Sequence, residues 1–185
     1  MEAPLPGHRW KTPFVWEPGR PPPSTAQRLA FEAAPHDWLL ATVARVMASS
    51  ADESDKHAVK ELGRSRAAEE LLAPAPQYFE HRPEWWKLAA DGQGRRIGFV
   101  LPVLFLGEMH KKDGRPKGTI LYIGVLPEFR GRGYGQDLLA EARRTCIAAN
   151  CWRISCDTGT DNYPMVNAFR QAGYIEREPW QRPVK

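Results

Sequence analysis

The sequence predicts one α/β (α+β) domain, in which a mixed, mostly antiparallel central sheet is flanked by helices and preceded by a Pro- and aromatic-rich arm. Three observations lead to this prediction. The chain has 185 residues, 42% hydrophobic and 26% charged, which are ordinary values for one globular domain. Its middle contains three consecutive strand patterns joined by turn residues, which favours antiparallel pairing. Its last third alternates helical and extended patterns.

The N-terminal part differs in composition from the rest, so we treat residues 1–23 as an arm and residues 24–185 as the domain. Eight of the 17 prolines precede residue 36, and the run Pro21-Pro22-Pro23 excludes a helix. Four alternate positions would share one face of an extended chain: Trp10, Thr12, Phe14 and Trp16. This pattern predicts an edge strand that packs on the domain or on a partner.

A short strand and two helices are expected next. Leu29 and Phe31 alternate as in a strand, and Asp37 is a suitable cap for the first helix. The apolar face of that helix contains Leu39, Leu40, Val43, Val46 and Met47. A second, more charged helix is predicted over 55–72, because Pro74 and Pro76 end the pattern.

The remaining elements alternate between strands and helices. Three antiparallel strands are predicted over 84–90, 96–106 and 117–125, joined by clusters of turn residues. The predicted order after them is a helix over 135–150, a strand over 152–156, a helix capped by Asp161 or Asn162 and ended by Gly173, and a strand over 174–177.

Composition argues against several classes of protein. The longest apolar run, over 97–106, contains Pro102 and is half as long as a membrane-spanning helix needs. The first thirty residues carry no secretory signal pattern. The net charge of +4 and the pI near 9.1 come without a Lys/Arg run, so an anionic small molecule is a better expectation than nucleic acid.

The cysteines indicate the redox environment. Cys146, Cys151 and Cys156 are an odd number in a chain without a signal pattern, which predicts reduced thiols and a cytoplasmic location. Their spacing of five residues, without a nearby His, is not typical of zinc ligands. We therefore predict no metal site and interpret the cysteines as small apolar core residues.

The most informative stretch is 123–135, where a strand pattern continues through a glycine-rich turn into a helix. Gly131, Gly133 and Gly135 remove side chains from the turn, so the backbone can approach a ligand closely. The helix that follows offers unpaired N–H groups and a partial positive charge at its start. Arg130 and Arg132 add charge at the rim. Together these features predict a phosphate or pyrophosphate site.

Two nucleotide-binding motifs do not fit this turn. A P-loop needs Lys-Ser/Thr after its last glycine, where this chain has Gln136-Asp137. The dinucleotide fingerprint G-x-G-x-x-G fails as well, because the three glycines here have a different spacing.

A third motif fits. Arg130-x-x-Gly133-x-Gly135 after Val125-x-Pro127 resembles motif A of the GNAT superfamily, the GCN5-related N-acetyltransferases. The segment 162–174, Asn-Tyr-Pro-Met-Val-Asn-Ala-Phe-Arg-Gln-Ala-Gly-Tyr, is similar to motif B of the same family. Both motifs occur in the family's order, and the resemblance covers roughly 117–177. It implies the GNAT fold, with acetyl-CoA as the cofactor.

The resemblance implies a role for each matching residue. The backbone of Ile123, Gly124 and Val125 would pair with the pantetheine arm as an added strand, and an N–H of this strand would polarise the thioester carbonyl. A β-bulge-like splay after Val125 would open the sheet for the thioester. The remaining cofactor-binding residues would be Arg130, Gly131, Arg132, Gly133, Tyr134 and Gly135 around the pyrophosphate, Asn162 beside the pantetheine arm, and Phe169 in motif B.

Two departures from the family pattern concern proton transfer. Phe169 stands where motif B usually has a Tyr that would protonate the departing thiolate. The strand positions at which many relatives carry a Glu or His hold Leu121 and Thr119. An alkylamine with a pKa near 10.4 must lose a proton before it attacks, which costs roughly 4–5 kcal/mol at pH 7. We hypothesise that Glu108 is the general base, with His110 and Asp157 as alternatives.

A third departure lies at the C-terminal end. Twelve residues follow Gly173, too few for two full closing strands. We hypothesise that the aromatic arm over 10–16, from the same chain or from a partner, fills the missing edge.

The leading prediction is an enzyme that moves an acetyl group from acetyl-CoA to a primary amine by direct attack in a ternary complex. The acceptor is a small-molecule or peptide amine that no motif specifies, and residues 36–72 are expected to form much of its wall. A homodimer is common in the family; no nucleic-acid or membrane partner is expected. The alternative is a non-catalytic acyl-CoA-binding module of the same fold, and a nucleic-acid-binding protein is supported only by the mild positive charge.

Overall fold

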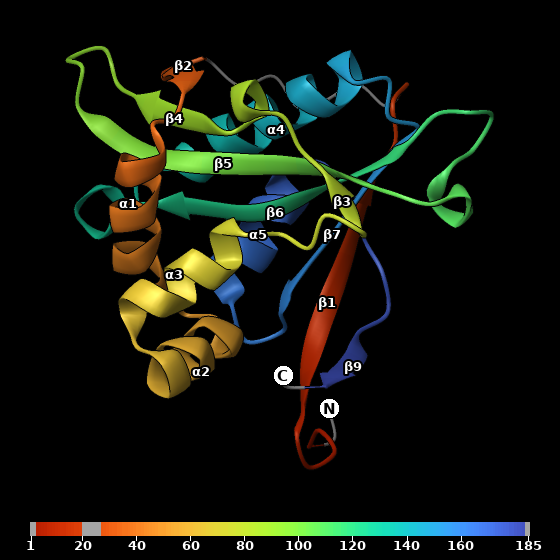
Figure 1. Cartoon of the computed structure of the whole chain (residues 1–185), viewed down its shortest axis with the longest axis horizontal. Coiled ribbons are helices and arrows are strands. Elements are labelled where there is room, and N and C mark those ends of the chain that lie inside the picture. Colours follow the sequence, from red (N-terminus) through yellow and green to blue (C-terminus); the bar gives the residue numbers. More distant parts are fainter. Residues whose placement is uncertain (1–2, 20–26, 184–185) are drawn as a thin grey trace.

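The computed structural model describes residues 3–19 and 27–183, which form nine strands and five α-helices (Figure 1). The strands are β1 (His8–Trp16), β2 (Ala30–Ala33), β3 (Phe79–Glu80), β4 (Lys87–Ala90), β5 (Arg96–Phe105), β6 (Lys117–Val125), β7 (Arg153–Gly159), β8 (Ile175–Glu176) and β9 (Trp180–Pro183). The helices are α1 (His36–Ala48), α2 (Glu53–Leu62), α3 (Arg64–Leu72), α4 (Tyr134–Ala148) and α5 (Tyr163–Gln171). Three 3-10 segments are η1 (Pro83–Trp85), η2 (Glu108–His110) and η3 (Pro127–Phe129).

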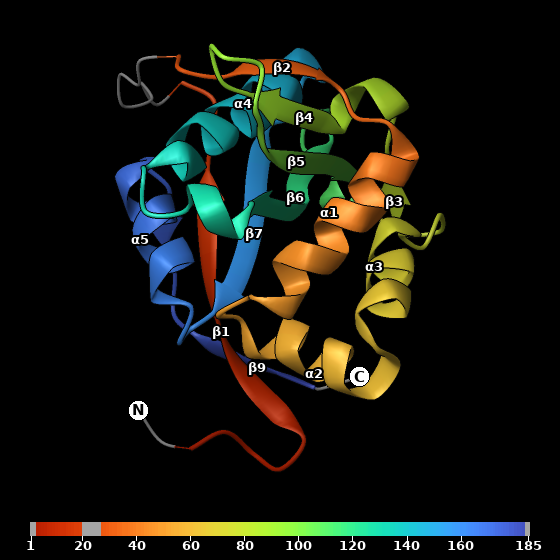
Figure 2. The same ribbon diagram turned by 90° about the vertical axis from the view of Figure 1, so that its left-hand side faces the viewer.

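The strands make one sheet in the order β2-β4-β5-β6-β7-β1-β8, with β3 on β5 and β9 on β1. Neighbouring strands are antiparallel throughout, except that β6 and β7 run parallel. The predicted mixed, mostly antiparallel sheet is confirmed. Figure 2 shows α1 and α3 on one side of this sheet and α4 and α5 on the other.

Both faces of the central strand β5 are buried, and each contributes to a separate core. Phe99, Leu101 and Val103 pack with the apolar residues of α1 and α3. Ile97 and Val100 pack with those of α4 and α5. Burial on both faces accounts for the continuous apolar run that marks this strand in the sequence.

The predicted edge strand of the arm lies inside the sheet instead. β1 pairs with β7 from Lys11↔Gly159 to Trp16↔Ile154, and its other edge carries β8 and β9. The edge-strand prediction is wrong because both faces and both edges of β1 are covered. The arm does supply a strand next to β7, from the same chain, but the outer edge beyond it is formed by β8 and β9. The proposed boundary between residues 23 and 24 lies in 20–26, outside the described residues.

Other boundaries differ for local reasons. The charged helix predicted over 55–72 is two helices, because Gly63 takes a positive φ of 78° between them. Pro35, and not Asp37, occupies the N-cap position of α1. The strand predicted over 84–90 starts as the 3-10 turn η1, where Pro83 is the first residue. Strand β9 was not predicted.

Phe14 offers a direct test of how β1 is held. Its side chain is fully buried and its ring stacks on Phe169 with centroids 4.8 Å apart. A buried Phe→Ala change costs about 3–5 kcal/mol. We expect Phe14→Ala to lower the free energy of unfolding by that amount in urea denaturation. Leu5→Ala, at a residue 59% exposed before β1, should change it by less than about 0.5 kcal/mol. An unchanged midpoint for Phe14→Ala would contradict the core position of β1.

Candidate active site

The site begins where the two parallel strands β6 and β7 separate. Their register contains two residue pairs, Lys117↔Arg153 and Gly118↔Ile154. Beyond Gly118, β6 continues to pair with β5 on its other side as far as Val125. Within the described residues, the edge of β6 that faces β7 therefore has no strand partner after Gly118. The backbone of Ile120 hydrogen-bonds the Cys156 thiol, and the groups of Ile123, Gly124 and Val125 on this edge are available to a ligand.

Gly118 marks the closed end of this separation. A Cβ atom on Gly118 would lie 2.9 Å from the Sγ of Cys146 and 3.1 Å from the Sγ of Cys151. A side chain at this position would push the two sulfur atoms aside, so glycine lets β6 pass closely over the buried cysteines. The cysteines are free and buried, as the sequence predicted for core residues.

A β-bulge lies within β6, and not after Val125 as expected. Leu101 pairs with Tyr122 but Pro102 pairs with Ile120, so Leu121 is an extra residue. Pro102 has no N–H to continue the ladder, which explains the break at this position. As a result Leu121 and Tyr122 both pack on the side of α1 and α3. Tyr122 lies opposite Leu101, which faces this side, and Leu121 is the residue that the bulge adds to it.

A cleft of about 850 Å³ occupies the space between the separated strands. This volume is in the range of small-molecule sites. One half of the cleft is formed by the glycine turn, the start of α4 and α5, and the other by the α1–α2 loop, α2, β1 and β9. The predicted cofactor residues that line it are Ile123, Gly124, Val125, Arg130, Gly131, Gly133, Tyr134, Gly135, Asn162 and Phe169. Arg132 and Glu108 are outside the lining.

The glycine turn presents its N–H groups to the cleft. Gly131 and Gly133 both have a φ of 75°, and Gly133 is the N-cap of α4. No carbonyl in the described part of the chain accepts a backbone hydrogen bond from the N–H groups of 131–135. Free N–H groups at the start of a 15-residue helix are suited to a phosphate.

Arg28 holds this turn from the opposite side. Its guanidinium donates to the carbonyl oxygens of Arg132 and Gly133, both at 2.9 Å, and forms an ion pair with the buried Asp137. These hydrogen bonds hold the carbonyl groups of Arg132 and Gly133 on the Arg28 side of the turn. Sequence reasoning missed Arg28, because its partners are more than a hundred residues away in the chain.

Arg130 has a structural role that the sequence did not indicate. Its guanidinium donates to the carbonyl oxygens of Val125 (3.1 Å) and Ser49 (2.6 Å), so it ties the end of β6 to the end of α1. Arg132 is exposed and lies against the ring of Phe129. Neither arginine forms an ion pair with a carboxylate, as far as the described residues go.

Glu108 lies far from the position that a general base requires. Its carboxylate pairs with Lys111 at 2.7 Å and its side chain is 87% exposed. Because β5 and β6 are antiparallel, with Leu104 beside Gly118, the end of β5 lies at the closed end of the separation and not at the cleft. The same argument removes His110 as a candidate. Tyr174 is buried and is not part of the cleft lining, so its hydroxyl does not face the cleft.

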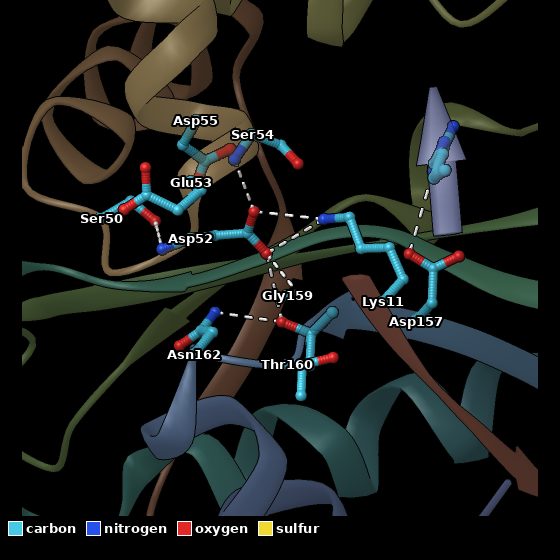
Figure 3. A network of polar contacts seen from close by, with 12 residues as sticks. Lys11, Ser50, Asp52, Glu53, Ser54, Asp55, Asp157, Gly159, Thr160 and Asn162 are labelled. Atoms are coloured by element: carbon cyan, nitrogen blue, oxygen red, sulfur yellow. Dashed lines mark hydrogen bonds and ion pairs between the residues drawn. The ribbon is translucent and has the colours of Figure 1, made fainter. Parts of the chain in front are cut away.

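The half of the cleft beside α2 contains a buried polar network (Figure 3). Lys11 of β1 forms an ion pair with Asp52 at 3.1 Å. The same carboxylate accepts hydrogen bonds from the backbone N–H groups of Ser54 and Gly159, both at 2.8 Å. Burial alone would raise the pKa of Asp52, but the Lys11 charge and these N–H donors outweigh it and lower the pKa to about 2.

A second carboxylate lies one helical turn further along α2. The hydroxyl of Tyr122 donates to Asp55 at 2.6 Å, and Asp55 is 8% exposed. Burial raises the pKa of Asp55 above its usual value, against hydrogen bonds from Ser50 and Tyr122, and the charge of Asp52 raises it further. Burial and the charge of Asp55 also raise the pKa of Tyr122, so its hydroxyl stays protonated and remains the donor.

Three further side chains that line the cleft are Asn162, Cys156 and Asp157. Asn162 donates to the hydroxyl of Thr158 at 3.0 Å and does not cap its own helix through its side chain. Burial raises the pKa of the Cys156 thiol to about 12, so it is not a thiolate. Asp157, a sequence candidate for the base, lies 3.8 Å from Arg182 of β9. The residues described here include no cluster suited to a metal ion and no helix able to cross a membrane.

The family model described as "Acetyltransferase (GNAT) family" matches residues 52–174. Acetyltransferase YE1169 from Yersinia enterocolitica is 30% identical over 94 residues, which are 51% of this chain and 60% of that protein. The match thus spans about three fifths of this curated relative.

Solved structures share the fold. PH1933 from Pyrococcus horikoshii superimposes with a TM-score of 0.58 at 17% identity, covering 85% of this chain and 99% of that one. The spermidine N-acetyltransferase from Vibrio cholerae, solved with CoA and spermine, gives 0.55 at 16% identity and covers 83% and 84%. At these identities the likeness establishes the fold alone.

The Asp52 network predicts a specific loss of stability in acid. Its pKa is depressed in the folded protein relative to an ordinary value of 3.8. The stabilisation is therefore complete above about pH 4 and is lost as the pH falls through about 2, amounting to about 2 kcal/mol. We expect the free energy of unfolding of the wild type to fall between pH 6 and pH 2. In Asp52→Asn this fall should be smaller by about 2 kcal/mol. Asp113→Asn, at an exposed turn, is the matched control, and equal pH differences in all three proteins would refute this assignment.

Proposed function

The chain belongs to the acetyltransferase (GNAT) family, and on this basis we propose that it transfers an acetyl group from acetyl-CoA to a primary amine by direct attack in a ternary complex. The family uses acetyl-CoA as its acetyl donor. The observation that supports the proposal most is the continuous cleft that joins the glycine turn to the free edge of β6 and then to α2.

The residues present fit acetyl-CoA. The N–H groups of 131–135 would hold the pyrophosphate, since they have no carbonyl acceptor in the described structure and stand at a helix start. The edge of β6 over Ile123, Gly124 and Val125 would bind the pantetheine arm as an added strand. Asn162 and Phe169 would form the facing wall from α5.

The chain's own groups then have two tasks. When bound, acetyl-CoA supplies an activated acyl carbon. An N–H of the free β6 edge would donate to the thioester oxygen, where negative charge develops during attack. The wall formed by α2, β1 and β9 would hold the amine on the other side of that carbon, because this half of the cleft carries the ionisable side chains.

A non-catalytic acyl-CoA-binding module is the second candidate, and one observation favours it. Phe169 is 3% exposed and stacks on Phe14, so position 169 of motif B offers no hydroxyl to the departing sulfur. Such a module would bind acetyl-CoA with the same residues and would release no CoA thiol in the presence of amines.

Binding of acetyl-CoA is tested by Gly135→Glu. Gly135 lines the cleft in the first turn of α4, and a Cβ there would meet only Ala168 at 3.8 Å, so the change adds a negative charge without straining the backbone. We expect calorimetric titration to give micromolar binding for the wild type and a loss of more than about tenfold in Gly135→Glu, from repulsion of the pyrophosphate. Gly92→Glu, where a Cβ meets open space in the β4–β5 turn, should bind as the wild type does. Wild-type affinity in Gly135→Glu would reject this cofactor site.

Turnover separates the enzyme from the binding module. We expect release of CoA thiol from acetyl-CoA when the wild type is given primary amines, with a panel that includes a simple alkylamine, spermidine and a lysine-containing peptide. Gly135→Glu should lose this activity and Gly92→Glu should keep it. Tight binding of acetyl-CoA without thiol release for any amine would favour the binding module.

A further inference from the structure

Some of the ionisable side chains in the α2 half of the cleft form ion pairs with one another, and others do not. They are Arg9, Lys11, Asp52, Asp55, Asp157 and Arg182, together with His57. Asp52 is neutralised by Lys11 at 3.1 Å, and Asp157 lies 3.8 Å from Arg182. Asp55 differs from both other carboxylates, because no cation in the described part of the chain forms an ion pair with it. Hydrogen bonds reduce the cost of burying the Asp55 carboxylate, and a ligand cation beside it would reduce that cost further.

Two contacts fix the position of Asp55, and a third fixes Tyr122, which makes one of them. The Asp52 side chain caps α2 through Ser54 and so sets the first turn, in which Asp55 lies. The Tyr122 hydroxyl donates to the Asp55 carboxylate at 2.6 Å. The Tyr122 ring is in turn stacked on Phe99, with centroids 5.8 Å apart. The carboxylate is therefore held in one place by packing and by hydrogen bonds.

The location is the one that an attacking amine needs. Tyr122 lies opposite Leu101 and packs on the same side of the sheet as α1 and α3, whereas its neighbour Ile123 packs on the other side. Asp55, Tyr122 and Ile123 all line the same cleft. The carboxylate thus lies on the acceptor side of the strand that would orient the thioester.

We propose that Asp55 binds the ammonium group of the acceptor and accepts its proton, and that Tyr122 positions the Asp55 carboxylate for this step. Asp55 is a catalytic residue under this proposal, and Tyr122 is a positioning residue. The inference rests on the proposed acetyl transfer and deepens it, because it defines the acceptor as an amine that enters as a cation.

Every proton and every bond in the proposed transfer step is accounted for. The alkylammonium ion gives one proton to the Asp55 carboxylate and becomes a neutral amine. The nitrogen lone pair attacks the thioester carbon, the C–N bond forms, and the C–S bond breaks with its electron pair going to sulfur. The nitrogen gives its second proton to the thiolate, which leaves as the CoA thiol. Protonated Asp55 then releases its proton to solvent, and the products are an amide and free CoA.

The surroundings of Asp55 favour this role. Burial raises the pKa of its carboxyl and outweighs the hydrogen bonds from Ser50 and Tyr122, which lower it; the charge of Asp52 raises it further and that of Lys11 lowers it. A carboxylate whose pKa is raised is a better proton acceptor than a solvated one. Tyr122 keeps its own proton and so cannot replace Asp55 as the acceptor of a proton.

The proposal is tested with Asp55→Asn, Tyr122→Phe and the control Glu53→Gln. Asn keeps the shape of Asp55 and can still accept from Tyr122, and Glu53 is a half-exposed carboxylate in the same turn that pairs with Lys56. Acetyl-CoA affinity should stay within about twofold of the wild type in all three, measured by calorimetry, since none contacts the glycine turn. For a simple alkylamine, kcat/KM should fall about 100-fold or more in Asp55→Asn and about tenfold in Tyr122→Phe. Glu53→Gln should match the wild type.

Two readouts separate a base from a structural residue. Trifluoroethylamine is largely uncharged at neutral pH, so its acetylation should be affected by Asp55→Asn no more than about threefold, because no proton has to be removed first. With the alkylamine, the activity of Asp55→Asn should rise steadily between pH 6 and pH 9 as free amine accumulates, whereas the wild type should depend less on pH. An equal loss of activity for both amines, or alkylamine activity within about threefold of the wild type in Asp55→Asn, would refute the role of Asp55. Acetyl-CoA binding by the wild type without turnover of any amine would instead refute the proposed transfer, and this inference with it.

Discussion

The separation of β6 from β7 is the constraint on which the rest of the structure depends. In the part of the chain that the structure describes, two parallel strands that part after Gly118 leave backbone N–H and C=O groups without a strand partner, and buried backbone groups need partners. Two contacts hold the strands in this arrangement. At the closed end, β6 passes over the buried cysteines at Gly118, where a Cβ atom would lie 2.9 Å from the Sγ of Cys146. At the far end, Asp52 accepts from the N–H of Gly159 at the end of β7, so α2 and β7 are tied together across the cleft by one carboxylate.

The N-terminal strand makes this arrangement stable. β1 lies between β7 and β8, with Phe14 and Trp16 in the core and Arg9 and Lys11 in the cleft lining. Phe14 stacks on Phe169 of α5, while Lys11 supplies the charge that Asp52 needs. A segment that composition separates from the domain therefore contributes both to the core and to the wall of the site. Without Lys11, Asp52 would be a buried charge lacking its ion-pair partner, which is strongly destabilising.

Local patterns in the sequence predicted what local physics determines. The bounds of β6, the glycine turn and the motif B helix follow from residue spacing within a few turns of chain, and the structure has them where they were expected. Arg28, the bulge at Leu121 and the Asp55–Tyr122 pair could not be found in this way, because their partners are distant in sequence and the bulge depends on Pro102 in a neighbouring strand. Glu108 could have been excluded as the general base from the predicted strand order alone. In an antiparallel pair the end of one strand lies beside the start of the next, so a residue after β5 is at the end of β6 opposite to Val125.

The Phe at position 169 also bears on how much acid–base chemistry the site must supply. Its ring packs against Phe14 and, edge-on at 5.1 Å, against Tyr174, so the position is part of the core that holds β1. A hydroxyl at this position would have to find a partner among apolar rings or in the cleft. Acetylation of an ammonium ion removes two protons from nitrogen, and the thiolate itself accepts one of them. The protein therefore needs only one proton acceptor and no separate acid. A single carboxylate on the amine side of the thioester is sufficient for this balance, and Asp55 has that position.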